Sequence, residues 1–333
     1  MTPPNRAGLQ FGAKVGNHDP SGSAANGAVG VERSAPSATV GVVIRTLNES
    51  ELLPRCLQTL RAQQSRFGLD IVVVDSGSTD GTIELAEAAG VRVVELSPDE
   101  FDYSKALNTG IANVEGEVVV SLSAHAIPVD DGWLGTMTAP FDDPKVAGVS
   151  CRQIPWPDAP WQELHRLRHA FGTERAVYSR INRDDIVFSN AASVIRRSVW
   201  NEQPFTLPAV EDLDWARRVV DRGFLVLYEP KTAVYHSHNE SPRAQARRMI
   251  DINRVSDHRL PRTRRRTVRE GVGYLVRDSA KILALDEPIS RKAAYLVDLL
   301  QTVGYYIADF SRGGTTAERR REDSQAHSTH ELS

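Results

Sequence analysis

The stretch Val40-Gly-Val-Val-Ile-Arg-Thr-Leu-Asn-Glu49 decides the fold, because an apolar run rich in β-branched residues passes directly into polar ones. Such a run is typical of a strand that is buried on both faces of a parallel sheet. Asn48 and Glu51 have the spacing of a capping box, which predicts that a helix begins at this point. A buried strand followed at once by a helix is the repeating unit of an α/β fold.

The same alternation continues toward the C-terminus. Further buried strands are expected at 71–74, 91–96 and 118–122, and helices at 82–89 and 105–112. The second half is less regular, with a strand expected at 188–195, a helix at 211–222 that Gly223 ends, and short strands at 225–228 and 232–235. The pattern predicts an α/β fold with a Rossmann-like, mainly parallel sheet, helices on both faces and a C-terminal helical extension.

Composition narrows the functional class. The chain has 333 residues, of which 41% are hydrophobic and 25% charged, as is ordinary for a globular protein. The net charge of −3 lacks the positive excess that whole-chain binding of nucleic acid needs, so we expect no nucleic-acid partner. Cys56 and Cys151 cannot form a disulfide framework or a four-thiolate zinc site. They favour a reducing compartment, so we expect a cytoplasmic protein, with the inner face of the membrane as an alternative.

The sequence divides into four parts. Residues 1–37 lack an apolar pattern, so we expect a disordered leader, and we expect a disordered tail at 311–333. The globular domain is expected at 38–240, with halves at 38–129 and 130–240. Residues 241–310 are expected to form an Arg-rich helical extension that is interrupted at Pro288. This extension is compatible with a phosphorylated acceptor, with peripheral contact to an anionic membrane, with plain solvation, and with a homodimer.

Polar residues follow three of the expected strands, at 45–49, 75–81 and 121–125. Because the carboxyl ends of parallel strands meet at one edge of a sheet, these residues are expected to form a nucleotide site. An acidic pair, Glu211 and Asp212, and two histidines, His236 and His238, are further candidates for chemistry.

Several motifs in order resemble glycosyltransferase family 2, which has the GT-A fold. They are Val40–Glu49, Val72–Thr82, Ala106–Gly110 and Glu211-Asp212, and the resemblance runs from about residue 39 to 240. The segment 101–108 is similar to bacterial rhamnosyltransferase-like members. The resemblance implies an inverting transfer of a sugar from a nucleotide-diphosphate sugar to the hydroxyl of a carbohydrate, lipid-linked or small-molecule acceptor. It implies a role in bacterial polysaccharide or glycoconjugate biosynthesis, with donor binding at 38–129 and catalysis at 130–240.

The resemblance also implies which residues hold the donor. They are Thr46, Asn48, Glu49, Asp75, Ser76, Gly77, Ser78, Asp80, Lys105, Asn108, Ser123 and Ala124. Asp75 suits this role because an ionised carboxylate only accepts hydrogen bonds and so reads an N–H edge of a base. The alternatives are that Asp75 and Asp80 cap a turn, that Lys105 is solvated, and that Asn108 fixes a loop.

The expected metal site departs from the family pattern. An Asp-x-Asp-like motif usually follows the fourth strand, whereas this chain has Ser121-Leu-Ser-Ala-His-Ala126. His125 is therefore the candidate ligand for a divalent ion, Mn²⁺ or Mg²⁺, and imidazole suits Mn²⁺ better. His236 or His238 would supply a second ligand, and strand alternation predicts that only one of them faces the site. The alternative is that His125 only hydrogen-bonds a diphosphate oxygen or packs structurally.

The acidic pair is the candidate for catalysis. The resemblance assigns the base to Asp212, which would take the acceptor proton, and Glu211 would orient the acceptor or the metal shell. The alternative is a pair of acids that complement a helix dipole. Trp156, Trp161 and Trp215 are candidates for stacking on an acceptor sugar, and packing alone is the alternative.

Three rival functions remain at this stage. One is a GT-A-like protein that binds sugar nucleotides without turnover, because Ser-Ala-His replaces Asp-x-Asp. Another is an NAD-linked oxidoreductase, which is disfavoured because no G-x-G-x-x-G follows the first strand. The third is nucleic-acid binding by the Arg-rich helix.

Overall fold

The computed structural model describes residues 38–157, 159–238, 241–247, 250 and 264–310. The expected leader at 1–37, the expected tail at 311–333 and residues 251–263 of the Arg-rich segment lie outside these described residues. Their predicted states therefore stay predictions.

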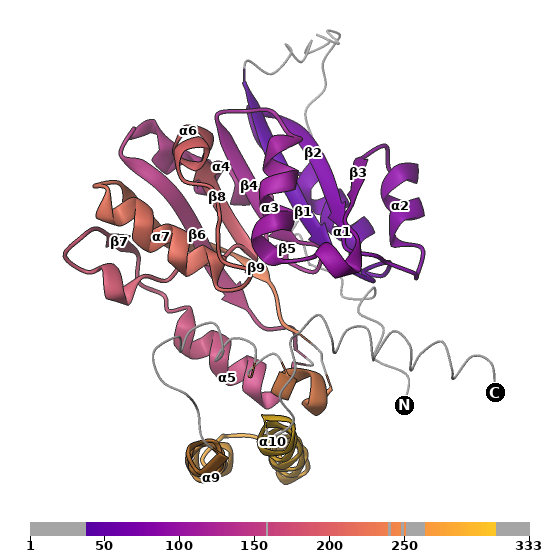
Figure 1. Cartoon of the computed structure of the whole chain (residues 1–333), viewed down its shortest axis with the longest axis vertical. Helices are drawn as coiled ribbons and strands as arrows, with labels where there is room; N and C mark the ends of the chain where they lie inside the picture. The colour runs from indigo at the N-terminus through magenta and orange to yellow at the C-terminus, as the bar shows by residue number, and fades with distance from the viewer. Residues whose placement is uncertain (1–37, 158, 239–240, 248–249, 251–263, 311–333) are drawn as a thin grey trace, which may run out of the picture.

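A nine-stranded sheet runs through the molecule in the order β3-β2-β1-β4-β8-β6-β9-β5, and β7 pairs with β9 (Figure 1). The strands are β1 Thr39–Thr46, β2 Gly68–Asp75, β3 Arg92–Glu95, β4 Val118–Ser123, β5 Ile127–Pro128, β6 Val146–Ile154, β7 Ala176–Tyr178, β8 Ala192–Arg196 and β9 Leu225–Tyr235. The first four strands pair in parallel, as predicted, and β8 joins β4 in the antiparallel sense. The expected order of buried strand and helix is thus confirmed in the first half.

Helices cover both faces of this sheet, as predicted. They are α1 Leu53–Arg61, α2 Thr82–Ala88, α3 Tyr103–Ala112, α4 Trp133–Thr138, α5 Trp161–Ala170, α6 Arg197–Glu202, α7 Glu211–Asp221, α9 Arg264–Leu283 and α10 Ile289–Phe310. One apolar cluster joins α1, α2 and α4 to one face, and a second joins α3, α6 and α7 to the other. Burial of these two clusters away from water supplies the main driving force for folding.

The C-terminal extension is a helical pair that packs beside α5 (Figure 1). Its helices end and begin on either side of Pro288, as predicted. Trp161 of α5 is buried in the same apolar cluster as Ile282 of α9 and Leu299 of α10. Among the described residues, no helix combines the length and the apolar character that a membrane span needs.

The predicted capping box at Asn48 is wrong. Helix α1 begins only at Leu53, and its N-cap residue Leu52 makes no side-chain capping bond. Asn48 instead adopts a left-handed backbone with φ 54°, and its Oδ1 accepts a hydrogen bond of 2.8 Å from the backbone N of Thr79. A long-range contact has therefore taken the side chain that the local pattern assigns to the helix.

The second half of the sheet differs from its prediction in extent. The strand expected at 188–195 begins only at Ala192, because the preceding residues turn toward the acidic pair. The two short strands expected at 225–228 and 232–235 are one strand, β9, with an irregular register opposite Cys151 and Arg152. The short elements between residues 127 and 178 were not expected.

Gly110 makes close packing of α3 on β1 feasible. A Cβ atom at this position would overlap Val43 Cγ1 of β1, a stiff β-branched side chain. We expect Gly110→Ala to lower the free energy of unfolding by about 1–3 kcal/mol, as overpacking does. Gly135→Ala in α4 is the matched control, since its Cβ would meet nothing within 4 Å. Urea unfolding of both variants measures the difference, and equal stabilities would contradict this account.

Candidate functional site at the carboxyl edge of the sheet

The expected polar clusters meet at one edge of the sheet. In the strand register Thr46 of β1 lies opposite Asp75 of β2, and Arg45 lies opposite Ser123 of β4. The backbone N of Ala124 donates to the carbonyl of Arg45 at 3.0 Å. The sheet therefore brings the three clusters together as the parallel pattern predicted.

Asp75 organises the turn that follows β2. Its carboxylate is fully buried, and its Oδ1 accepts hydrogen bonds from the backbone N atoms of Gly77 at 2.9 Å and Ser78 at 2.8 Å. Its Oδ2 accepts from Ser78 Oγ at 2.5 Å. Gly77 has φ +95°, which a glycine adopts without strain. The turn-capping alternative for Asp75 is thus present in the structure, and its contact with a base stays a prediction.

Asp80 holds the same turn against the loop after β1. Its Oδ2 accepts from the backbone N of Ser50 at 3.0 Å, and its Oδ1 accepts from the backbone N of Thr82 at 3.1 Å. Partial burial alone would raise the pKa of Asp80, but the hydrogen bonds from Thr82 and Ser50 outweigh it and lower the pKa. Asp80 therefore holds the residue at which α2 begins and ties two loops of the edge together.

Lys105 and Asn108 of α3 face different surroundings. The Nζ atom of half-exposed Lys105 lies 3.0 Å from Glu100 Oε1. The Asn108 amide donates to the carbonyl of Phe205 at 2.8 Å and accepts from Trp200 Nε1 at 2.9 Å. Asn108 thus fixes the loop before α7, which is the second of the two roles considered for it, rather than presenting its amide to a sugar.

The acidic pair opens α7 beside a buried asparagine. Glu211 Oε1 accepts from Asn190 Nδ2 at 3.3 Å, and Asp212 Oδ2 accepts from the backbone N of Asn190 at 3.4 Å. The preceding residue, Val210, has φ 60°, a strained conformation for a β-branched residue that sets the direction in which the pair enters the helix.

Arg45 connects this pair to the sheet. Its Nη2 donates to the carbonyl of Asn190 at 3.2 Å, and its Nη1 lies 4.0 Å from Glu211 Oε1. Arg45 precedes Thr46, which lies opposite Asp75 in the sheet, and Arg45 bonds Asn190, which in turn bonds Asp212. Asp75 and Asp212 therefore lie at the same edge of the sheet.

Burial perturbs both acids of the pair. It raises the pKa of Glu211, and the nearby negative charge of Asp212 raises it further, while Arg45 acts in the opposite direction. Burial also raises the pKa of Asp212, against hydrogen bonds from Leu213 and Asn190. Two neighbouring buried carboxyl groups with raised pKa values are typical of a site that exchanges protons.

Three histidines lie close together at the same edge of the sheet as the acidic pair. His125 follows β4, His236 and His238 follow β9, and one ligand atom from each lies within 4.8 Å of the others. The His125 and His236 rings stack with centroids 4.9 Å apart. The prediction that only one of His236 and His238 faces the site is therefore wrong. Strand β9 ends at Tyr235, so strict alternation no longer applies beyond it.

The side chain of Glu49 belongs to the histidine cluster. Its Oε1 lies 2.5 Å from His125 Nδ1, while its backbone N donates to Thr82 Oγ1 at 2.9 Å. Glu49 therefore contacts the expected metal ligand rather than lining a nucleoside pocket with its carboxylate. The three imidazoles fit a divalent ion, because His125 Nε2 is buried without a hydrogen-bond partner among the described residues.

Unpartnered buried polar atoms gather at this edge. Within the described chain, Arg45 Nε and Thr46 Oγ1 share this property with His125 Nε2. Buried polar atoms in proteins are almost always hydrogen-bonded, so atoms like these are suited to the polar groups of a ligand.

Three residues of the site were not predicted from the sequence: Arg45, Asn190 and Gln153, whose Oε1 lies 2.7 Å from His236 Nδ1. Arg45 lies in the first polar cluster, which was a usable signal. Asn190 and Gln153 lie in β-like segments with no motif, so nothing in the sequence singles them out.

The predicted stacking of three tryptophans on an acceptor is wrong. Trp156, Trp161 and Trp215 are almost completely buried. Trp156 stacks on Tyr235 with centroids 5.0 Å apart, and Trp215 Nε1 donates to the carbonyl of Gln203 at 2.8 Å. The packing alternative therefore holds for all three.

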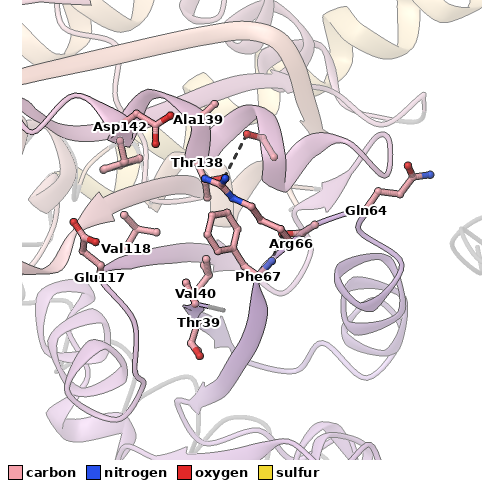
Figure 2. A pocket seen from close by; sticks show the side chains of 14 residues that line it. Thr39, Val40, Gln64, Arg66, Phe67, Glu117, Val118, Thr138, Ala139 and Asp142 are labelled. Carbon is pink, nitrogen blue, oxygen red and sulfur yellow. Dashed lines mark hydrogen bonds between the residues drawn. The ribbon is translucent and has the colours of Figure 1, made fainter. Parts of the chain in front are cut away.

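A separate hollow of about 570 Å³ lies at the opposite edge of the sheet (Figure 2). The first residues of β1 and β4, Thr39 and Val118, line it together with Phe67 and Glu117. It lies at the amino ends of these strands, whereas the acids and histidines described above lie at the carboxyl ends. It therefore takes no part in the candidate chemistry.

Known proteins show similarity to this chain. The family model of glycosyl transferase family 2 matches residues 41–202, a segment that ends before α7. The O-antigen chain rhamnosyltransferase RfbN of Salmonella typhimurium is 28% identical over 222 residues, covering 64% of this chain and 70% of the relative. The O-antigen chain rhamnosyltransferase WbaN of Salmonella anatum is 30% identical over 198 residues, covering 57% of this chain and 63% of the relative.

Solved structures are more distant. A mannosyltransferase from Pyrobaculum calidifontis, in complex with GDP-Man and Mn²⁺, is 19% identical with a TM-score of 0.48. The match covers 89% of this chain and 82% of that one.

Proposed function

We propose that the protein is an inverting glycosyltransferase, because residues 41–202 match the family model of glycosyl transferase family 2. It moves a sugar from a nucleotide-diphosphate sugar to an acceptor hydroxyl, in bacterial polysaccharide or glycoconjugate biosynthesis. Both relatives named above are rhamnosyltransferases of O-antigen chains, which favours rhamnose as the sugar and a growing carbohydrate or lipid-linked acceptor.

One observation carries this proposal. The edge that ends β1, β2 and β4 combines unpartnered buried atoms of Arg45, Thr46 and His125 with the buried Glu211 and the half-buried Asp212 of α7. The first group offers polar contacts for a nucleotide diphosphate, and the second offers a proton acceptor. A nucleotide-sugar transferase needs both at one place.

The proposed reaction is a single displacement. The acceptor hydroxyl oxygen attacks the anomeric carbon, a new carbon–oxygen bond forms, and the bond from that carbon to the diphosphate oxygen breaks. The acceptor proton passes to the carboxylate of Asp212, and the nucleoside diphosphate leaves with the bonding electron pair. Glu211, held by Asn190, orients the acceptor or the metal shell.

Charge on the leaving group needs compensation. A divalent ion held by His125, His236 and His238 would neutralise part of the diphosphate charge. Lys105 of α3 is the proposed protein cation for the same task, since its ammonium group pairs with the exposed Glu100 and can exchange that partner for a phosphate.

A panel of sugar nucleotides tests the proposed function. The full chain is heated with UDP-, dTDP- and GDP-sugars, including dTDP-rhamnose, and each is then tested for transfer or hydrolysis. We expect one nucleotide class to raise the unfolding temperature and to be consumed. Protection without turnover would favour the rival sugar-nucleotide-binding protein, and no protection by any of them would contradict the proposal.

Asp75→Asn is expected to weaken nucleotide binding by about 1–3 kcal/mol, because it replaces a charged acceptor with an amide that also carries a donor. The variant keeps an acceptor oxygen for the turn, so the fold is expected to persist. Asp70→Asn, at the start of the same strand in an exposed pair with Arg92, is the matched control. Calorimetric titration with the protecting nucleotide measures both. Unchanged affinity of Asp75→Asn would leave the residue as a turn cap only.

The C-terminal helices bear on the acceptor. Val272 and Val276 of α9 and Val297 and Leu300 of α10 expose large apolar side chains. The peripheral membrane contact and the homodimer that the sequence suggested both need such an apolar surface. Both stay predictions, and we propose a cytoplasmic location, with the inner face of the membrane as the alternative.

A further inference from the structure

Two acceptor oxygens orient the rings of the histidine cluster, which consists of His125, His236 and His238. Glu49 Oε1 lies 2.5 Å from His125 Nδ1, and Gln153 Oε1 lies 2.7 Å from His236 Nδ1. A carboxylate oxygen and an amide carbonyl oxygen can only accept, so each Nδ1 is the donor. The Nε2 atom of each neutral ring then carries a lone pair.

The three rings lie close together, with one ring nitrogen of each within 4.8 Å of the others. The His125 and His236 planes differ by 10°, and their centroids are 4.9 Å apart. His238 stands edge-on to both, at 70° and 79° and about the same distance. His125 Nε2 is buried with no hydrogen-bond partner among the described residues, as suits an atom that would meet a bound ion.

The outer contacts come from parts of the chain that are themselves fixed. Glu49, in the loop after β1, donates its backbone N–H to Thr82 Oγ1 at the start of α2, at 2.9 Å. Gln153 is almost fully buried in β6, opposite Val234 of β9. Buried Glu163 of α5 accepts a long hydrogen bond of 3.5 Å from the backbone N of His238. Ring orientation is therefore set by the fold before any ion arrives.

We propose that Glu49 and Gln153 are positioning residues that hold His125 and His236 with Nε2 toward a common centre, making an all-imidazole site that prefers Co²⁺ and Zn²⁺ to Mg²⁺. Imidazole suits Zn²⁺ and its neighbours in the first row, whereas Mg²⁺ is served by carboxylate, carbonyl and water oxygens. The three clustered ligands offer no oxygen, and the carboxylate of Glu49 contacts His125 at Nδ1. This inference rests on the proposed function only for the placement of the ion beside a diphosphate.

Loss of the contact between Glu49 and His125 is expected to weaken metal binding. Glu49 connects the ion's ligand to Thr82, which follows the turn that Asp75 and Asp80 organise. Partners that accept from the far nitrogen of a metal-bound histidine fix its tautomer and raise its basicity, and their loss typically lowers metal affinity about 10- to 100-fold.

The test is a titration of the metal-free full chain with Co²⁺, followed by visible absorption, without donor or acceptor. Competition with Zn²⁺ and with Mg²⁺ then ranks the ions. We expect visible bands typical of nitrogen ligation, displacement by Zn²⁺, and no displacement by Mg²⁺ at a hundredfold excess. Glu49→Gln and Gln153→Leu are expected to weaken Co²⁺ binding about 10- to 100-fold.

Matched variants separate positioning from general damage. Glu51→Gln alters an exposed acid two residues from Glu49 and is expected to bind Co²⁺ like the unaltered chain. Gln153→Glu keeps an acceptor oxygen and is expected to bind Co²⁺ more tightly than Gln153→Leu. Circular dichroism verifies the fold of each variant. If Gln153→Leu does not fold, the Co²⁺ affinities of Glu49→Gln and Gln153→Glu are compared with that of the unaltered chain instead.

Three results would overturn the inference. They are displacement of Co²⁺ by Mg²⁺, absence of Co²⁺ bands in the folded chain, and undiminished affinity in Glu49→Gln and Gln153→Leu. Failure of the proposed function looks different, because a chain that neither binds nor consumes any sugar nucleotide would still give the Co²⁺ titration described here.

Discussion

Asp212→Asn is expected to lower the rate of sugar transfer by about 100- to 10,000-fold, the range over which a positioned general base acts. The amide keeps the size of the side chain and an acceptor for the backbone N–H groups of Asn190 and Leu213, so the start of α7 is expected to stay in place. It cannot take the acceptor proton. Nucleotide binding, measured by thermal protection, is expected to be unchanged.

Asp214→Asn is the matched control for this loss. It lies two residues along the same helix, where its Oδ2 accepts from Arg218 Nε at 2.8 Å in a partly exposed pair. Removing such a pair costs about 0–1 kcal/mol and leaves the acidic pair untouched. Equal rates in Asp212→Asn and Asp214→Asn would move the base to another residue, with Glu211 the first to be tested.

The same assignment predicts a pH dependence. Burial raises the pKa of Asp212, and the base works only when deprotonated. The transfer rate is therefore expected to rise with pH through this raised pKa and to fall on the acidic side at a higher pH than for an ordinary aspartate. A transfer rate that does not change with pH across the acidic range would contradict a carboxylate as the base.

Local patterns were sufficient for the first half of the fold. Strand β1 and its parallel neighbours are long apolar runs with polar residues at one end, so both their type and the meeting of their carboxyl ends could be predicted. The second half combines short strands with antiparallel pairs such as β8 on β4. Their partners lie far away in sequence, and no local period marks them.

The site shows the same limit at the level of single side chains. Asn190 joins Ser121, Arg45 and Glu211 through contacts that span at least 21 positions, so no spacing in the sequence reveals it. Asn48 matched a capping box, yet a contact 31 positions away holds its side chain. The strand rule failed for His236 and His238 because the strand had already ended.

Arg45→Met is expected to destabilise the protein by about 3–5 kcal/mol at neutral to alkaline pH, because it leaves the buried acids without the cation that faces them. Arg45 is 11% exposed and Glu211 is 6% exposed, so solvent screens their interaction little. Methionine keeps the apolar stem and its volume. Urea unfolding of the variant measures the loss.

The loss is expected to shrink as the pH falls. Without Arg45 the folded-state pKa values of Glu211 and Asp212 rise further above those of the unfolded chain, so the folded state binds more protons. Stability then falls as pH rises through that window and recovers as the acids become neutral. The acidic limb of the transfer rate is expected to move to higher pH for the same reason.

Arg92→Met is the matched control, because it removes an arginine that pairs with an acid in a more exposed place. Arg92 pairs with Asp70 near the start of β2, but the Arg92 side chain is 57% exposed. Water can therefore solvate Asp70 when the arginine is removed. A loss of at most about 1 kcal/mol is expected there. If both arginine variants lose stability equally and without regard to pH, Arg45 stabilises the sheet only by packing. A loss confined to Arg45→Met and to high pH would show that the Arg45 cation stabilises the ionised forms of Glu211 and Asp212.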